Sequence, residues 1–91
     1  MTKSEIMIWR AARELLGMDL YESDERLRRE FSGRTVFDND MTTVRTGAEM
    51  VFVTWMDDGR ERRLTFTWPQ FLKEVRRIGN ENAQQLSEAE V

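Results

Sequence analysis

The chain has 91 residues, room for one domain, and 40% of them are apolar while 34% are charged, a balance typical of a globular protein. It contains no cysteine and no histidine. These absences exclude a disulfide framework, the usual zinc ligands, the usual general base and the thiol nucleophile. No long apolar run follows the charged N-terminus, so we expect neither a signal peptide nor a membrane span, and a cytoplasmic location.

The net charge of −3 is concentrated at the end of the sequence. Residues 1–79 hold all 14 basic residues and 14 of the 17 acidic ones, while Glu81, Glu88 and Glu90 come later. We therefore predict a formally neutral α+β domain over residues 1–79 and a polar, acidic, flexible tail over residues 80–91. A neutral domain argues against a DNA mimic and against a nonspecific nucleic-acid binder, which needs basic charge to neutralise phosphates.

Two helices are predicted in the first third of the chain. The first covers residues 5–16, with Ser4 as N-cap and Gly17 as its stop. The second covers residues 23–32 and ends at Gly33; its acids lie in the first turn and its arginines near the end, as the helix dipole favours. Apolar side chains recur at helical spacing at Ile8, Trp9, Ala12, Leu15 and Leu16, and then at Leu27 and Phe31.

The middle of the chain predicts an antiparallel meander of three or four strands. Its apolar and β-branched runs are separated by turn residues. A hairpin loop, Asp57-Asp58-Gly59-Arg60, joins the last two strands, and its glycine suits the left-handed position. The predicted strands cover residues 35–37, 42–46, 49–56 and 61–67.

The clearest start signal in the chain belongs to a third helix. Thr67 and Gln70 have the spacing of a capping box, and Phe66 and Phe71 that of a hydrophobic staple. We expect this helix to end at Gly79. The predicted fold is therefore an N-terminal helix pair, the antiparallel three- or four-stranded meander, and a C-terminal helix packed on the sheet.

The strand over residues 49–56 is apolar on both faces. A strand with one solvated face alternates apolar and polar residues, which this strand does not do. We expect helices to cover both faces, the C-terminal helix on one and the N-terminal helices on the other. The alternative is that another chain covers one face. The two sets are Met50, Phe52 and Met56 on one side, and Val51, Val53 and Trp55 on the other.

Basic residues gather after the hairpin loop. Arg60 and Arg62 share one face of their strand and Arg63 lies on the other. An arginine beside Trp55 can stack on its ring, and arginines interleaved with aromatic side chains are one signature of single-stranded nucleic-acid binding. The alternative is a solvated edge strand whose charges block aggregation.

No catalytic or metal-binding motif is found in the sequence. It has no glycine-rich phosphate loop and no nucleophile elbow, and its serines have no histidine to activate them. Asp38-Asn39-Asp40 begins like a calcium loop, but the glycine and the closing glutamate are missing, so it reads as a turn. We predict a protein that is not an enzyme and that needs no cofactor and no metal.

In its size, its lack of cysteine and its lack of an active-site motif, the chain resembles small phage-encoded accessory proteins, anti-CRISPR inhibitors among them. The resemblance implies a module that binds a protein partner and acts as a stoichiometric inhibitor or regulator of a larger complex. The alternatives are an arginine-based nucleic-acid-binding protein and a homodimer subunit paired through the apolar sheet face; no membrane partner is expected.

The end of the hairpin is the predicted partner-binding site. Tryptophan and arginine carry much of the energy of protein interfaces, and a loop tip reaches a partner without disturbing the core. The competing site is the outer face of the second helix, with Arg26, Arg28 and Arg29. The predicted site residues are Trp55, Asp57, Asp58, Arg60, Arg62 and Arg63.

Overall fold

The computed structural model of the chain describes residues 1–17, 19–38 and 42–83. Within these residues the chain forms three helices and one antiparallel sheet of four strands in the order β1-β2-β3-β4. The predicted α+β fold is confirmed, with four strands. The elements follow the order α1 (Lys3–Leu16), α2 (Asp24–Phe31), β1 (Thr35–Asp38), β2 (Thr42–Thr46), β3 (Met50–Asp57), β4 (Arg60–Thr67) and α3 (Trp68–Glu81).

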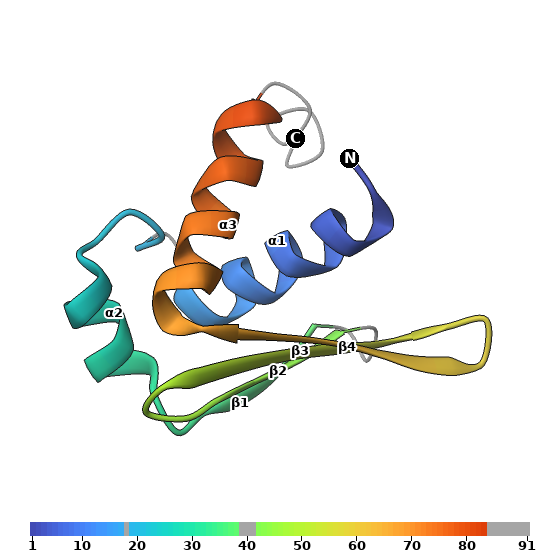
Figure 1. Ribbon diagram of the computed structural model, residues 1–91, viewed down its shortest axis with the longest axis horizontal. Coiled ribbons are helices and arrows are strands. Elements are labelled where there is room, and N and C mark those ends of the chain that lie inside the picture. Colours follow the sequence, from blue (N-terminus) through green and yellow to red (C-terminus); the bar gives the residue numbers. More distant parts are fainter. Residues whose placement is uncertain (18, 39–41, 84–91) are drawn as a thin grey trace.

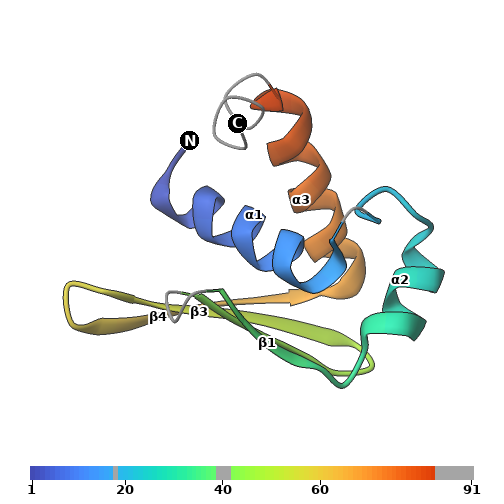
Figure 2. The ribbon, with the colours of Figure 1, turned by 180° about the vertical axis from the view of Figure 1, so that it is seen from behind.

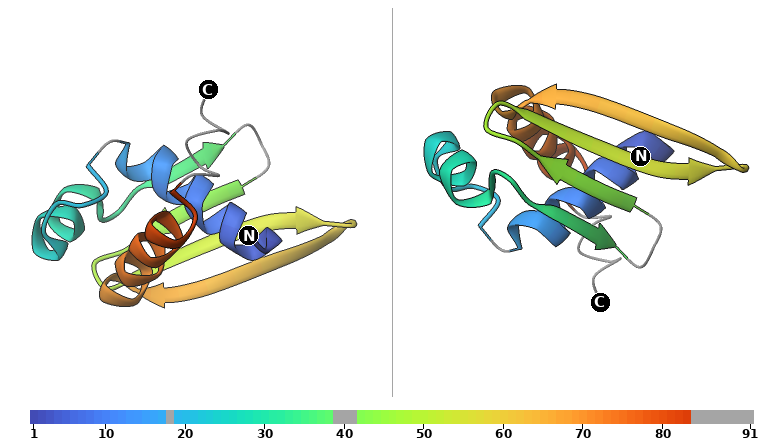
Figure 3. Two further views of the ribbon diagram at one scale, coloured as in Figure 1. Left: turned by 90° about the horizontal axis from the view of Figure 1, so that it is seen from above. Right: turned by 90° about the horizontal axis from the view of Figure 1, so that it is seen from below.

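Both long helices lie on the same face of the sheet (Figures 1 and 2). In β3, Val51, Val53 and Trp55 are buried under the helices, whereas Phe52 is half-buried and Met56 is exposed on the other side. Seen from below, the strands lie in front of the helices (Figure 3). The prediction that helices cover both faces is therefore wrong, because α1 and α3 pack side by side on one face and no described element covers the other.

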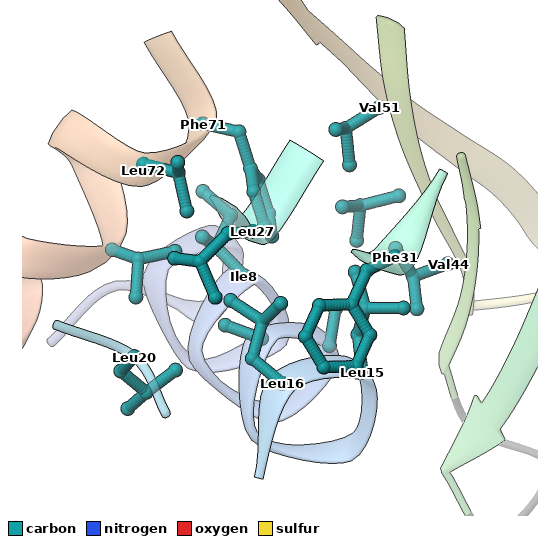
Figure 4. Close-up of a cluster of buried hydrophobic side chains, with 14 of the residues drawn as sticks. Ile8, Leu15, Leu16, Leu20, Leu27, Phe31, Val44, Val51, Phe71 and Leu72 are labelled. Atoms are coloured by element: carbon teal, nitrogen blue, oxygen red, sulfur yellow. The ribbon is translucent and has the colours of Figure 1, made fainter. Parts of the chain in front are cut away.

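The core lies between the helices and the inner face of the sheet (Figure 4). The last helix contributes four side chains at helical spacing, each at most 1% exposed: Phe71, Leu72, Val75 and Ile78. Trp68 is also buried, and its Nε1 donates a hydrogen bond to the carbonyl of Gly47 at 2.9 Å. This bond fixes the start of α3 over the loop between β2 and β3.

The first helix begins earlier than its apolar spacing predicts. Thr2 is the N-cap: its hydroxyl accepts from the Glu5 amide at 3.2 Å, and the Glu5 carboxylate accepts from the Thr2 amide at 2.9 Å. The prediction of Ser4 as the cap is wrong. Three residues after Ser4 comes Met7, which cannot return a hydrogen bond, so the reciprocal pair forms at Thr2.

The start of α3 follows the sequence signal. The Thr67 hydroxyl accepts from the Gln70 amide at 3.3 Å, and the Gln70 side chain accepts from the Thr67 amide at 3.1 Å. The rings of Phe66 and Phe71 lie 5.8 Å apart, which completes the staple. These contacts satisfy backbone donors that a helix start leaves free.

The hairpin between β3 and β4 is tighter than the predicted loop. Asp57 and Arg60 pair with each other as strand residues, which leaves a two-residue turn of Asp58 and Gly59. Both turn residues have positive φ, +52° and +77°. This is the type I′ geometry that Asp-Gly favours, because its twist matches that of the strands.

Gly79 does not end the last helix as predicted. The helix continues to Glu81, and Gly79 is buried within it. A Cβ at this position would lie 2.8 Å from the Tyr21 hydroxyl and 2.9 Å from Cζ3 of Trp9. Gly79 therefore allows α3 to approach α1 closely. Of the predicted tail, residues 84–91 lie outside the described residues.

We expect Thr67→Ala to lower the free energy of unfolding by about 1 kcal/mol, because it removes the hydroxyl that caps α3. Urea denaturation followed by circular dichroism measures this loss. Thr65→Ala, an exposed change on the same strand, is the control and should stay within about 0.5 kcal/mol of the parent. Equal denaturation midpoints for Thr67→Ala and the parent would contradict the assignment.

Substitution of Gly79 tests the close approach of the helices. Alanine favours a helix over glycine by about 1 kcal/mol, but overpacking costs about 1–3 kcal/mol, so Gly79→Ala should lose up to about 2 kcal/mol of stability. In a background with Trp9→Ala and Tyr21→Phe both close atoms are gone, and the same substitution should gain up to about 1 kcal/mol. The same sign in both backgrounds, measured by urea denaturation, would show that Trp9 and Tyr21 do not set the packing.

Candidate functional site

The uncovered side of the sheet, which we call the open face, is built from two cross-strand rows. Antiparallel pairing aligns one outward residue from each strand in each row. Because side chains alternate along a strand, these residues point away from the helices. The rows are Phe37, Thr43, Thr54 and Arg63, and then Thr35, Arg45, Phe52 and Thr65.

Large apolar side chains lie exposed on the open face. Phe37 on β1 and Met56 on β3 are each 60% exposed. Phe52 lies on β3 four residues from Met56, in the row next to that of Phe37, and is half-buried. Single exposed apolar residues are ordinary, but several on one uncovered sheet face are a feature of interaction surfaces.

Two arginines flank Phe52 on the open face. Arg45 is its cross-strand partner on β2, and the guanidinium carbon of Arg63 on β4 lies 6.0 Å from the centroid of its ring. Both arginines are exposed. Within the described part of the chain, no carboxylate lies at ion-pair distance from either guanidinium. Their donors are therefore available to a partner.

Several arginines on the helical side are bound to carboxylates. Arg76 reaches Asp24 at 2.6 Å, linking α3 to α2. Arg77 reaches Glu5 at 2.9 Å, linking α3 to α1. The hydrogen bond from the Thr2 amide and the Arg77 guanidinium lower the pKa of Glu5 to about 2. These arginines hold the helices together.

At the competing site on the second helix, two of the three arginines form ion pairs with nearby carboxylates. Arg26 pairs with Glu22 at 3.0 Å, and Arg29 pairs with Glu25 at 3.2 Å. Such exposed pairs along a helix contribute modestly to its stability. They also reduce the positive charge that this surface presents to a partner.

A shallow hollow of about 490 Å³ marks the middle of the open face. Phe52 lines it together with the two arginines and Glu61. Its size is in the range that holds a few side chains of a partner. The hollow therefore offers one aromatic surface, two cationic groups and one carboxylate in a single place.

Not all residues of the predicted hairpin site are exposed at the surface. Trp55 is 6% exposed and belongs to the core, so its ring is not available to a partner in this conformation. Its cross-strand neighbour is Arg62, whereas Arg63 points to the open face. The guanidinium–ring contact in this region joins Arg63 to Phe52 and not, as we predicted, an arginine to Trp55.

The remaining hairpin residues surround an ion pair that the sequence did not predict. Asp57 accepts a hydrogen bond from Lys3 Nζ at 2.7 Å, and Arg62 Nε lies 3.7 Å from its other oxygen. The hydrogen bond from Lys3 lowers the pKa of Asp57 below 3.8, against an opposing effect of burial. Asp58 and Arg60 are exposed at the tip.

The hairpin end and the open face adjoin each other. A second hollow, of about 380 Å³, lies beside the start of α1 and is lined by Lys3, Trp55, Asp57 and Arg62. Arg63 lines this hollow and the one on the open face. The structure therefore brings Lys3, Asp57 and Arg62 together, and Arg63 connects this group to the hollow beside Phe52.

Three residues of the open face were not among the predicted site residues, namely Phe37, Arg45 and Phe52. A signal was present for two of them, because a short turn at Gly47 brings Arg45 opposite Phe52 in an antiparallel pair. The missing information was which face the helices leave bare. That depends on contacts between distant elements and not on any local pattern.

No family model, no curated protein and no solved structure matches this chain. No helix among the described residues has the length and apolar character of a membrane span. In the same part of the chain, no group of three or more potential ligands is placed to hold a metal ion. The candidate site is therefore defined by its own geometry, which suits recognition through stacking, apolar contact and charge-assisted hydrogen bonds.

The Lys3–Asp57 contact predicts how stability depends on pH. The folded-state pKa of Asp57 is below its ordinary value of 3.8, so its stabilising effect is present above pH 3.8 and is lost as the pH falls through the folded-state pKa. Asp57→Asn should lower the melting temperature at pH 7, and its difference from the parent should shrink below pH 3.8.

Circular dichroism melts at a series of pH values measure this difference. The control is Asp58→Asn at the turn, where asparagine also accepts positive φ, and it should change the melting temperature little at any pH. A difference for Asp57→Asn that is as large in acid as at pH 7 would show that lost packing, and not the ion pair, causes it.

Proposed function

We propose that this chain is a small non-enzymatic protein-binding module that docks on a larger partner through the open face and the adjoining hairpin end. The observation that supports this proposal is the uncovered row of side chains around Phe52. Aromatic residues, methionine and arginine are enriched in protein interfaces. Here they share one face of a sheet whose other face is anchored by the core.

The mode of action we propose is stoichiometric inhibition or regulation of a larger macromolecular complex. A domain of this size supports it, because a rigid sheet can cover a surface on a partner while contributing no chemistry of its own. The resemblance in size and composition to phage-encoded accessory proteins, anti-CRISPR inhibitors among them, is the basis for a phage or prophage origin.

One observation favours a second candidate function, the binding of single-stranded nucleic acid. The Arg63–Phe52 contact combines a cation with an aromatic ring, and such pairs stack with bases. The neutral charge of residues 1–79 counts against it, since phosphate binding depends on an excess of basic residues.

Site-specific photo-crosslinking tests the proposed surface. Benzoylphenylalanine is introduced at Thr54, in the middle of the open face, or at Glu14, which is exposed on α1. In a lysate of the source cells we expect the Thr54 position to crosslink to one protein and the Glu14 position to yield no such product. A nucleic-acid adduct at Thr54, or the same product at both positions, would contradict the proposal.

Charge reversal then tests the hairpin end against the second helix. We expect Arg60→Glu with Arg62→Glu to weaken capture of the crosslinked protein at least tenfold, and Arg28→Glu with Arg29→Glu to leave it unchanged. Both variants should stay folded by circular dichroism, because surface substitutions seldom cost much stability. Loss of binding only in the second variant would move the site to α2.

A further inference from the structure

We infer that the open face binds an acidic protein segment, which places carboxylates on Arg45 and Arg63 and an apolar side chain beside Phe52. This inference rests on the proposed function and adds the chemistry of the partner. The two guanidiniums are exposed and have no carboxylate partner within the described residues. An arginine without a partner on a structured surface is ready for charge-assisted, bidentate hydrogen bonding.

The spacing of the three side chains suits an extended segment. Arg45 and Arg63 lie two strands apart and in adjacent rows, so their Cα atoms are separated by about 10 Å across the sheet and about 7 Å along the strands, about 12 Å in all. An extended chain repeats a face every second residue, about 7 Å, so positions i and i+4 are about 13 Å apart. The flexible arginine side chains cover the difference. A segment that runs diagonally across the three strands, with acids at i and i+4 and an apolar residue at i+2, therefore matches these side chains.

The charges on the open face argue against a second copy of this chain. Among the described strand residues, Arg45 and Arg63 share the face with one acidic residue, Glu61. Two such faces packed together would bring four guanidiniums against two carboxylates. Like charges facing each other across an interface are costly, whereas an acidic partner is complementary.

The wider charge distribution argues against a nucleic acid. Glu61 lines the same hollow as the two arginines, and Asp58 lies at the nearby turn. The whole chain has a net charge of −3. A polyanion would be attracted by two arginines and repelled by the rest, whereas a short acidic segment contacts the arginines alone.

The test is a titration of the isotope-labelled full chain followed by amide NMR. The probe is the blocked heptapeptide Ser-Glu-Ser-Phe-Ser-Glu-Ser, its control is the same peptide with glutamine for glutamate, and the third ligand is a ten-nucleotide oligouridylate. We expect the acidic peptide to shift the amides of Thr43, Thr54 and Thr65, and to bind at least tenfold more tightly than the glutamine peptide. Raised salt should weaken its binding.

Two matched variants locate the contact. Arg45→Gln with Arg63→Gln should abolish the preference for the acidic peptide, and Arg28→Gln with Arg29→Gln on α2 should keep it. The amide spectrum of each variant reports whether the fold is intact. If Arg45→Gln with Arg63→Gln unfolds the chain, Arg45→Lys with Arg63→Lys replaces it and should weaken binding by losing the bidentate geometry.

The inference is overturned if the glutamine peptide binds as tightly, if the oligouridylate binds more tightly, or if the shifts fall on the helices. Concentration-dependent shifts of the open-face amides without ligand would show a second copy there and would overturn it too. Different results decide the proposed function and the acidic-segment inference. A protein crosslinked at Thr54 without any preference for acid would leave the proposed function standing, and acid preference without a crosslinked protein would contradict the proposed function alone.

Discussion

The close packing of α1 against α3 on one side of the sheet determines what the rest of the molecule presents to solvent. Gly79 permits it, because any side chain at that position would meet the ring of Trp9. Two helices side by side bury the inner residues of the central strands. The same arrangement leaves the outer face of the sheet without a cover, and so creates the open face.

The arginines divide according to these two sides. Arg76 and Arg77 connect α3 to α2 and α1 through carboxylates, so they contribute to the fold. Arg45 and Arg63 contact no carboxylate among the described residues, and Arg63 lies against the Phe52 ring. The arginines therefore fall into two geometric groups, those paired with carboxylates between helices and those exposed on the open face, and only the geometry separates them.

Local signals predicted local structure well. The capping box of Thr67 and the strand pairing around Asp58-Gly59 depend on residues close in sequence, and both could be derived from it. Features that depend on distant contacts could not be derived. Gly79 has the sequence signature of a helix end but is a packing position, and the Lys3–Asp57 bond joins residues 54 positions apart. The open face belongs to this second class, and so does most of the candidate site.

A rigid surface has a thermodynamic advantage for a small binding module. Ordering flexible side chains or loops on binding costs free energy, and pre-organised groups avoid part of that cost. Phe52 is held by its strand neighbours, and the guanidinium of Arg63 lies over its ring. A sheet face of this kind is better suited to selective contact with a complementary charged segment than to burial against a large apolar surface.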